Sequence, residues 1–158
     1  MSTPTPEVAL ARRWTLQLDL SAAQDGSDWQ TVFGIAEFTP PAPDPNIEDS
    51  SDYESGGWNG KTKTAQEWEL AVTLNRKIND QVKVFHATHE YLRRAAWLFG
   101  SGSKAHLRWF DRQGMPEAYE GRGVVQWEAS GGEHTALDQV EVTIHGDGEL
   151  LLIDNPIA

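Results

Sequence analysis

Strict alternation of apolar and polar residues over short stretches is the feature that most constrains how this chain folds. The clearest case is residues 67–74, which place Trp68, Leu70, Val72 and Leu74 on one side and Glu67, Glu69, Ala71 and Thr73 on the other. Other strand-like stretches lie at 14–20, 30–38, 105–110, 118–129, 137–145 and 150–153. A strand with a period of two buries one face and exposes the other. The sequence therefore predicts a mainly β protein.

One segment has convincing helical periodicity. Within residues 81–99, apolar or bulky side chains recur every three or four positions, at Val82, Phe85, His89, Leu92, Ala96 and Phe99. This spacing is typical of an amphipathic helix, and Gly100 is suited to end it. Many strands and a single helix predict a β-sandwich or a partly closed barrel with one α-helix packed against it.

Length and composition indicate one folded domain spanning residues 1–158, with an N-terminal arm at 1–12. Hydrophobic residues make up 39% of the chain and charged residues 23%, which argues against general disorder. The absence of cysteine excludes disulfides and thiolate metal sites. The first residues lack the apolar run of a signal peptide, and no stretch is long enough to predict a membrane-spanning helix.

A long polar segment at 39–64 interrupts the strand pattern with the sequence TPPAPDPNIEDSSDYESGGWNGKTKT. Connections of this length are uncommon in compact domains and tend to be functional or disordered. Ile47, Tyr53 and Trp58 have no obvious place in a solvated linker. We expect a protruding loop whose apolar residues are buried by something outside the domain, with Lys61 and Lys63 able to select register against its acidic part. The alternative is a solvated loop whose charges attract each other.

The C-terminal part of the chain carries RWFDRQGMPEAYEGRGVVQWEA and, further on, VEVTIHGDGELLLIDNP. These stretches resemble the major tail tube proteins of long-tailed (siphovirus-type) bacteriophages, and the likeness covers most of the chain. It rests on strand spacing and turn chemistry, not on an invariant signature. In that family a β-sandwich flanked by a helix forms hexameric rings, which stack into the tube that delivers the genome. A long loop between two early strands reaches neighbouring subunits, a role that residues 39–64 would inherit.

The resemblance also implies partners and a location. The partners would be further copies of the chain, a tape-measure protein, and tail-tip and tail-terminator proteins. The location would be a virion tail made in the host bacterial cytoplasm, without membrane insertion or cofactor. A tail terminator or completion protein of the same fold, which caps the tube as one ring, is an alternative.

The charge of the chain fits a channel for DNA. Asp and Glu number 24 against 13 Lys and Arg, a net charge of −11. A wall that bound phosphates through Lys or Arg would hold the genome in place, whereas an acidic wall lets it slide. Glu67, Glu69 and Glu141 lie opposite apolar neighbours in their strands and are candidate lumen residues. The alternative is that they only solvate an outer sheet face.

Catalytic and metal-binding motifs are not evident, so we expect no enzyme. His86 and His89 are the one close histidine pair, but HATHE lacks the HExxH arrangement. Residues 44–55 begin like a calcium loop, yet Asp49 stands where glycine is needed and Ser55 where a bidentate Glu is needed.

A carbohydrate-binding β-sandwich is the alternative from another class, because the chain has seven tryptophans. Four of them are expected in the core or an interface, namely Trp14, Trp68, Trp109 and Trp127. Trp29 and Trp58 are then the main candidates for stacking on sugar rings.

Overall fold

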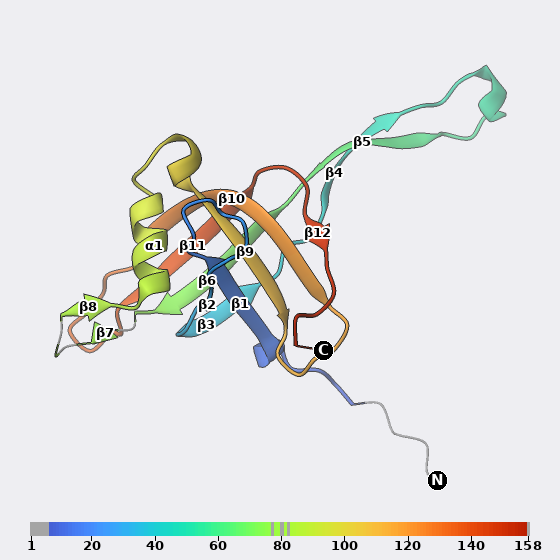
Figure 1. Ribbon diagram of the computed structural model, residues 1–158. Coiled ribbons are helices and arrows are strands. Elements are labelled where there is room, and N and C mark those ends of the chain that lie inside the picture. The colour runs from blue at the N-terminus through green and yellow to red at the C-terminus, as the bar shows by residue number, and fades with distance from the viewer. Residues whose placement is uncertain (1–6, 77, 80, 82, 158) are drawn as a thin grey trace, which may run out of the picture.

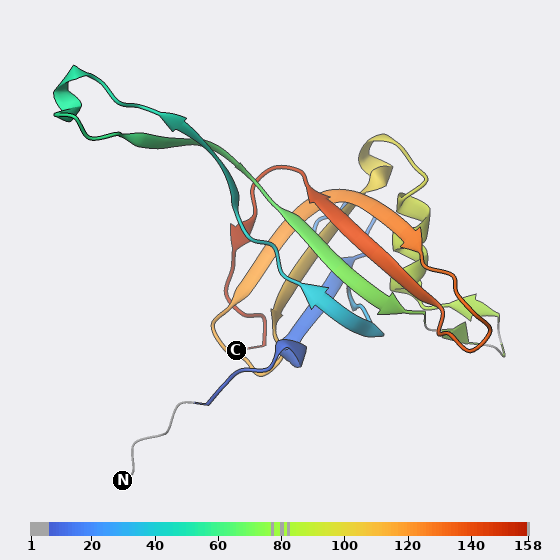
Figure 2. The ribbon, with the colours of Figure 1, turned by 180° about the vertical axis from the view of Figure 1, so that it is seen from behind.

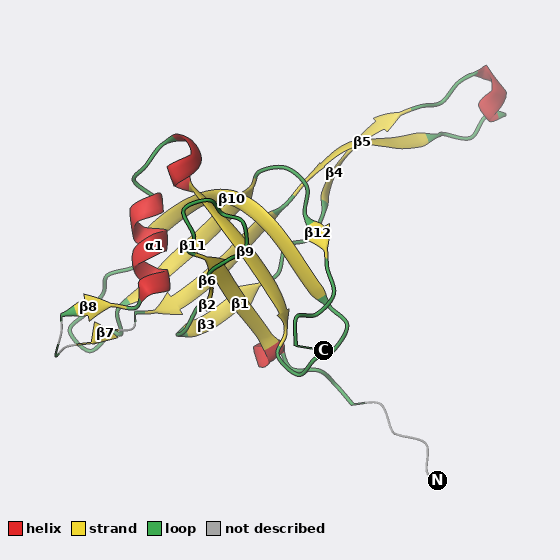
Figure 3. Ribbon diagram, in the orientation of Figure 1, coloured by secondary structure: helices red, strands yellow, loops and turns green. Residues whose placement is uncertain are grey.

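The computed structural model describes residues 7–76, 78, 79, 81 and 83–157. Its strands are β1 (Trp14–Asp19), β2 (Trp29–Thr31), β3 (Ile35–Thr39), β4 (Asp44–Asp49), β5 (Lys61–Glu67), β6 (Glu69–Asn75), β7 (Ile78–Asn79), β8 (Val84–Phe85), β9 (Lys104–Asp111), β10 (Ala118–Ala129), β11 (Gln139–Gly146) and β12 (Leu151–Leu152). The helices, drawn red in Figure 3, are α1 (Ala87–Ala95) and the short 3-10 helices η1 (Ala11–Arg13), η2 (Tyr53–Ser55) and η3 (Gly100–Ser103).

One antiparallel sheet forms the body of the molecule, in the order β2-β1-β9-β10-β11-β6-β3, with β12 paired to the start of β10 (Figure 1). The sheet curls until its two ends face each other across the core. Trp14 of β1 packs on Phe38 of β3, with ring centroids 5.9 Å apart. The end strands β2 and β3 share no ladder, so the sheet is not closed. The prediction of a mainly β, sandwich-like fold is confirmed.

The buried side of the sheet follows the alternation read from the sequence. All four predicted inward residues of 67–74 are buried, and so are Trp14, Leu16 and Leu18 of β1. Trp109 lies at the centre of the core, fully buried, and packs against Trp68 and Tyr119. Among the described residues no helix is long and apolar enough to span a membrane.

The single helix is present but shorter than predicted. It covers Ala87–Ala95, not 81–99, because Val84 and Phe85 pair as β8 with β7 and His86 caps the helix by accepting from the N–H of Thr88. Leu92 and Ala95 enter the core. Phe99 was predicted on the buried face but is 95% exposed, because the chain leaves the helix at Ala96 and turns at Gly100, which has a φ of +66°. Val82, another predicted core position, lies outside the described residues.

The N-terminal arm is described only from residue 7 onward, so residues 1–6 of the predicted 1–12 segment lie outside the described part of the chain. Val8 and Leu10 are exposed, and η1 leads directly into β1. Arg13 at the end of η1 donates to Asp111 at 3.0 Å and to Glu117 at 3.1 Å. This pairing attaches the start of β1 to the turn between β9 and β10.

Candidate functional site: the projecting arm and the acidic sheet face

The predicted protruding loop is a β-hairpin, which we call the arm (residues 44–67). Its strands β4 and β5 pair with each other, with Asp44 opposite Glu67 and Asp49 opposite Lys61, and a bulge between Asn46 and Ile47. The two opposite views show the arm leaving the body of the sheet and extending far from it (Figures 1 and 2). The sequence analysis treated the segment as a loop, because its alternation is masked by prolines and polar residues.

The tip of the arm (residues 50–60) is ordered by local hydrogen bonds. Asp52 caps the 3-10 turn by accepting from the N–H of Glu54 at 3.1 Å, and the Ser55 hydroxyl accepts from the N–H of Asp52 at 3.0 Å. Gly56 and Gly57 then take positive φ values of 64° and 86°. Neither a Cβ at Gly56 nor one at Gly57 would meet another atom within 4 Å, so their conformation, and not crowding, favours glycine there.

The apolar side chains of the arm are exposed within this chain. Trp58 is 83% exposed, Tyr53 is fully exposed and Ile47 is more than half exposed. Lys61 and Lys63 are also exposed; in the β4–β5 register Lys61 lies opposite Asp49 and Lys63 opposite Ile47, while the Lys63 ammonium donates to Gln66. The arm therefore presents every residue predicted for subunit contacts to the surroundings. Their role in such contacts stays a prediction.

Trp68 fixes the root of the arm. It stands between β5 and β6, is buried, and donates from its indole N–H to the carbonyl of Gly148 at 3.2 Å. Its ring lies so close to Gly146 and Gly121 that an added Cβ would be 2.5 Å and 2.8 Å from ring atoms. These glycines are needed for the close approach of the indole. The anchored indole determines where the chain leaves the sheet and enters the arm.

The outward face of one half of the sheet is polar and acidic. It consists of β3, β6, β11 and residues 123–129 of β10, and none of these segments contains Lys or Arg. Glu69 and Glu141 both lie on this face, and Glu69 approaches His145 to 4.0 Å. The alternation of apolar and polar residues thus correctly placed Glu69 and Glu141 on one outward face of the sheet.

Register adds two carboxylates that the sequence analysis missed. Glu141 lies directly opposite Glu128 on one side and opposite Thr73 on the other, and Thr73 in turn lies opposite Glu37. We call Glu37, Glu128 and Glu141 the acidic row. Like charges directly opposite each other in a sheet are destabilising. Only the pairing of strands brings these residues together, so the sequence pattern alone could not identify the row.

Glu67 belongs to the arm and not to this face. It is the last residue of β5, is exposed, and pairs with Asp44 of β4. The sequence pattern placed Glu67 and Glu69 on one continuous strand. The chain instead changes its pairing partner at Trp68, which separates the two glutamates into different sheets.

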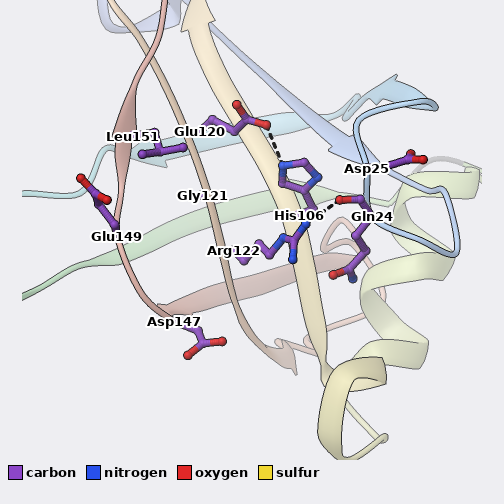
Figure 4. Close-up of a pocket in the computed structure, with 9 residues that line it drawn as sticks. All are labelled: Gln24, Asp25, His106, Glu120, Gly121, Arg122, Asp147, Glu149 and Leu151. Carbon is purple, nitrogen blue, oxygen red and sulfur yellow. Dashed lines mark hydrogen bonds and ion pairs between the residues drawn. The ribbon is translucent and has the colours of Figure 1, made fainter.

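A second polar cluster lies on the other half of the outward face, where His106 joins the carboxylates of Asp19 and Glu120. Figure 4 shows His106 together with Glu120. The Nδ1 of His106 lies 3.0 Å from Asp19 Oδ2 and its Nε2 lies 2.7 Å from Glu120 Oε1. The imidazole thus bridges the two carboxylates through its two ring nitrogens. Trp29 covers the imidazole at 4.8 Å, and Arg108 lies 4.3 Å over the Trp29 ring.

Asp19 is the fully buried member of that cluster. It accepts from the backbone N–H of Ser21 at 3.0 Å and of Gly26 at 2.6 Å, which closes the turn between β1 and β2. Burial favours the protonated form, but the hydrogen bonds outweigh it and hold the pKa of Asp19 well below its usual range. No local sequence pattern indicates this cluster, because 87 positions separate Asp19 from His106.

The described residues offer no arrangement of three or more His, Asp or Glu side chains that could hold a metal ion. His86 caps α1, and His89 is buried with its Nε2 at 2.8 Å from the carbonyl of Phe33. These contacts give both histidines structural roles.

Most of the tryptophans considered for sugar binding are buried or covered by other side chains. Trp14, Trp68 and Trp109 are buried, and Trp127 packs against the core. Trp29 is covered by His106 and Arg108, which leaves Trp58 as the exposed one of the two candidates.

Comparison with solved structures identifies proteins of the same fold. A chain of the native gene transfer agent (GTA) virion matches with a TM-score of 0.69 at 15% identity, covering 92% of this chain and 99% of that chain. A chain of the anti-feeding prophage (AFP) baseplate matches with a TM-score of 0.65 at 8% identity, covering 98% of both chains. A chain of the SPP1 tail tube matches with a TM-score of 0.64 at 14% identity, covering 92% of this chain and 79% of that chain.

The resemblance to tail tube proteins is therefore confirmed at the level of the fold. At identities of 8–15% the likeness concerns the fold alone. No protein-family sequence model matches the chain, and no curated protein sequence matches it.

Proposed function

We propose that this chain is a non-catalytic structural subunit of a phage tail tube, forming one tail-tube domain per subunit. The subunits assemble into hexameric rings, and the rings stack into a tube through which genomic DNA reaches the host. The observation that carries the proposal is the arm, whose aromatic tip is exposed on a fold shared with solved tail components.

The arm is poorly suited to remain unpartnered. An isolated two-stranded hairpin is marginal in water, and β4 and β5 contain only exposed residues. Trp58 and Tyr53 together offer large aromatic surfaces that no part of the described chain covers. Burial against sister copies would stabilise both the hairpin and the assembly. Ile47, Lys61 and Lys63 would lie in the same contacts.

Rings and stacks require different contacts. Strand edges are templates for pairing with another copy, and β2 and β3 form the ends of the main sheet. A heterologous contact that closes by rotation gives a ring, and a second interface stacks one ring on the next. Sixfold symmetry is proposed because the GTA tail was refined with C6 symmetry and the AFP baseplate was 6-fold symmetrised.

The acidic face would line the lumen. Glu69 and Glu141 share a face without Lys or Arg, and the acidic row places two carboxylates directly opposite each other despite the cost. Repulsion of phosphate along such a wall would let DNA pass without specific binding. Glu67 would then act in the arm and not in the lumen.

Other tail components would complete the particle. The proposed partners are a tape-measure protein and tail-tip and tail-terminator proteins, in a virion assembled in the host cytoplasm. The likeness to a baseplate chain over 98% of both lengths favours one second candidate, a ring of the same fold that ends the tube and does not extend it. Polymerisation separates the two: a tube subunit grows filaments, whereas a terminal ring stops at one layer.

Removal of the arm tests the proposal. Deletion of residues 46–61 should leave a folded monomer, because the arm adds nothing to the core. The expected result is an unchanged cooperative thermal unfolding transition together with loss of rings and tubes in negative-stain images. Tubes of normal length from the deleted chain would contradict the role of the arm. A full-length chain that stays monomeric at every concentration would contradict the function itself.

A further inference from the structure

The end of α1 carries an exposed aromatic cluster that the fold does not use. Trp97 is 81% exposed and Phe99 is almost fully exposed, and Leu98 between them is half exposed. The helix ends at Ala95, and the N–H groups of Trp97 and Leu98 bond to Arg94 and Ala95 in a tight final turn. Local backbone bonds thus hold these side chains at the surface.

A cleft of about 440 Å³ lies beside this cluster. Apolar lining residues of the cleft include Leu20, Ala87, Ala95 and Leu98, and Tyr91, Glu90 and Arg94 also line it. Tyr91 is held in place because its hydroxyl donates to the carbonyl of Lys104 at 3.3 Å. We call this surface, together with Trp97 and Phe99, the helix-end cleft.

Arginine side chains gather beside the helix-end cleft of an otherwise acidic protein. Glu90 contacts Arg93 at 2.6 Å and Arg94 at 3.6 Å, and Arg76 lies 4.0 Å away. Three guanidinium groups therefore share one carboxylate, and of these charged side chains Glu90 and Arg94 line the cleft itself. Arg94 is the outermost of the three, with 74% of its side chain exposed. An acidic, aromatic partner would fit this surface.

The arm has that chemistry. Residues 44–60 contain five acidic residues and no Lys or Arg, and the tip adds Tyr53 and Trp58. The arm and α1 lie on opposite sides of the molecule in both views, so an arm cannot reach the cleft of its own chain (Figures 1 and 2). We propose that the arm tip of one copy docks in the helix-end cleft of another copy. The proposal rests on the proposed function and names the receiving surface for its arm.

This contact joins two different surfaces and is therefore head-to-tail. Each copy offers one tip and one cleft, so in a tube the contact repeats from copy to copy, whereas reciprocal exchange of arms would close at a dimer. The charge pair between the tip and Arg94 sets register, while Trp58 and Tyr53 bury their rings beside Trp97 and Phe99.

Cross-linking of introduced cysteines tests the contact, and the chain has no cysteine of its own. Asn59 next to Trp58 and Ser101 next to the aromatic cluster are both exposed. In assembled Asn59→Cys/Ser101→Cys protein, a bis-maleimide should give a ladder of covalent oligomers. The matched control is Asn59→Cys/Gln113→Cys, because exposed Gln113 follows the far end of β9 and should not cross-link.

Exchange of two charges across the proposed contact provides an independent test of it. Glu54→Lys or Arg94→Glu alone should raise the protein concentration needed for assembly by about tenfold, and the double variant should restore it. In the cross-linking experiment, the docking contact alone would be overturned by tubes that form without the ladder, by equal cross-linking of the control, or by a product that ends at dimers. In the charge exchange, it would be overturned by a double variant that assembles no better than either single variant. A chain without any assembly would overturn the proposed function as well.

Discussion

Replacement of Trp58 by Ala should separate the stability of the subunit from the stability of the assembly. The side chain is 83% exposed in the single chain. Of the ~250 Å² that a tryptophan can bury, only about 40 Å² is already covered, which is worth ~1 kcal/mol at ~25 cal/mol per Å². The free energy of unfolding of the monomer should therefore fall by about 1 kcal/mol or less.

The same substitution should have a larger effect on assembly. Up to about 200 Å² of the indole remains to be buried on a neighbour, and aromatic anchors of interfaces contribute roughly 2–4 kcal/mol. Such a loss corresponds to a rise of about 30-fold to 1,000-fold in the concentration at which tubes form. Denaturant unfolding of the monomer and pelleting of tubes across a concentration series measure the two quantities.

Trp109→Ala is the matched control, because this indole is fully buried in the core. It should cost the monomer about 3–5 kcal/mol, whereas Trp58→Ala should not. A loss of monomer stability at Trp58 as large as that at Trp109, or tubes formed at the wild-type concentration, would refute the reasoning.

Three further substitutions test other parts of the account. Gly146→Ala should destabilise the monomer by about 1–3 kcal/mol, because its Cβ would lie 2.5 Å from the Trp68 ring; an unchanged melting temperature would contradict the anchoring of the arm. Glu141→Gln should stabilise the monomer by about 0.2–1 kcal/mol by relieving the repulsion from Glu128; destabilisation would disprove that repulsion. Asp19→Asn should lower stability at neutral pH by roughly 2–4 kcal/mol. Because the pKa of Asp19 is depressed in the folded state, the ionised side chain stabilises the fold above the ordinary aspartate pKa of about 3.9, and this stabilisation is lost as pH falls below that value. The melting temperature of the variant should therefore fall less steeply than that of the wild type between pH 7 and 2. Parallel curves of melting temperature against pH would count against this role.

The alternation along the chain was sufficient to predict the sheet, because each strand has one buried face. Leu70 and Leu74 are fully buried as expected, and the stretches 105–110 and 118–129 pair as a hairpin. The helix limits were wrong because apolar spacing cannot distinguish a side chain in the core from one exposed for a partner. Phe99 fits the helical period, yet it lies beyond the end of α1 at the surface.

The candidate site was predictable only in part. Trp58 and Tyr53 stood out because aromatic residues are unexpected in a polar, glycine-rich segment, and the structure exposes both. Glu128 and Glu37 could not be linked to Glu141, since their proximity depends on strand register. The same holds for Asp19 and His106, which come from strands far apart in the sequence. Local sequence patterns predict which side of a strand is buried, but only the pairing of strands in the fold brings distant residues together.

The most direct test of the account is an electron cryo-microscopy map of the assembled chain, in which the surroundings of Trp58 can be seen. The account predicts sixfold rings stacked into a tube, with the indole of each arm buried against a neighbouring copy. Tubes in which the arms extend into solvent, or purified protein that shows only separate monomers, would contradict it.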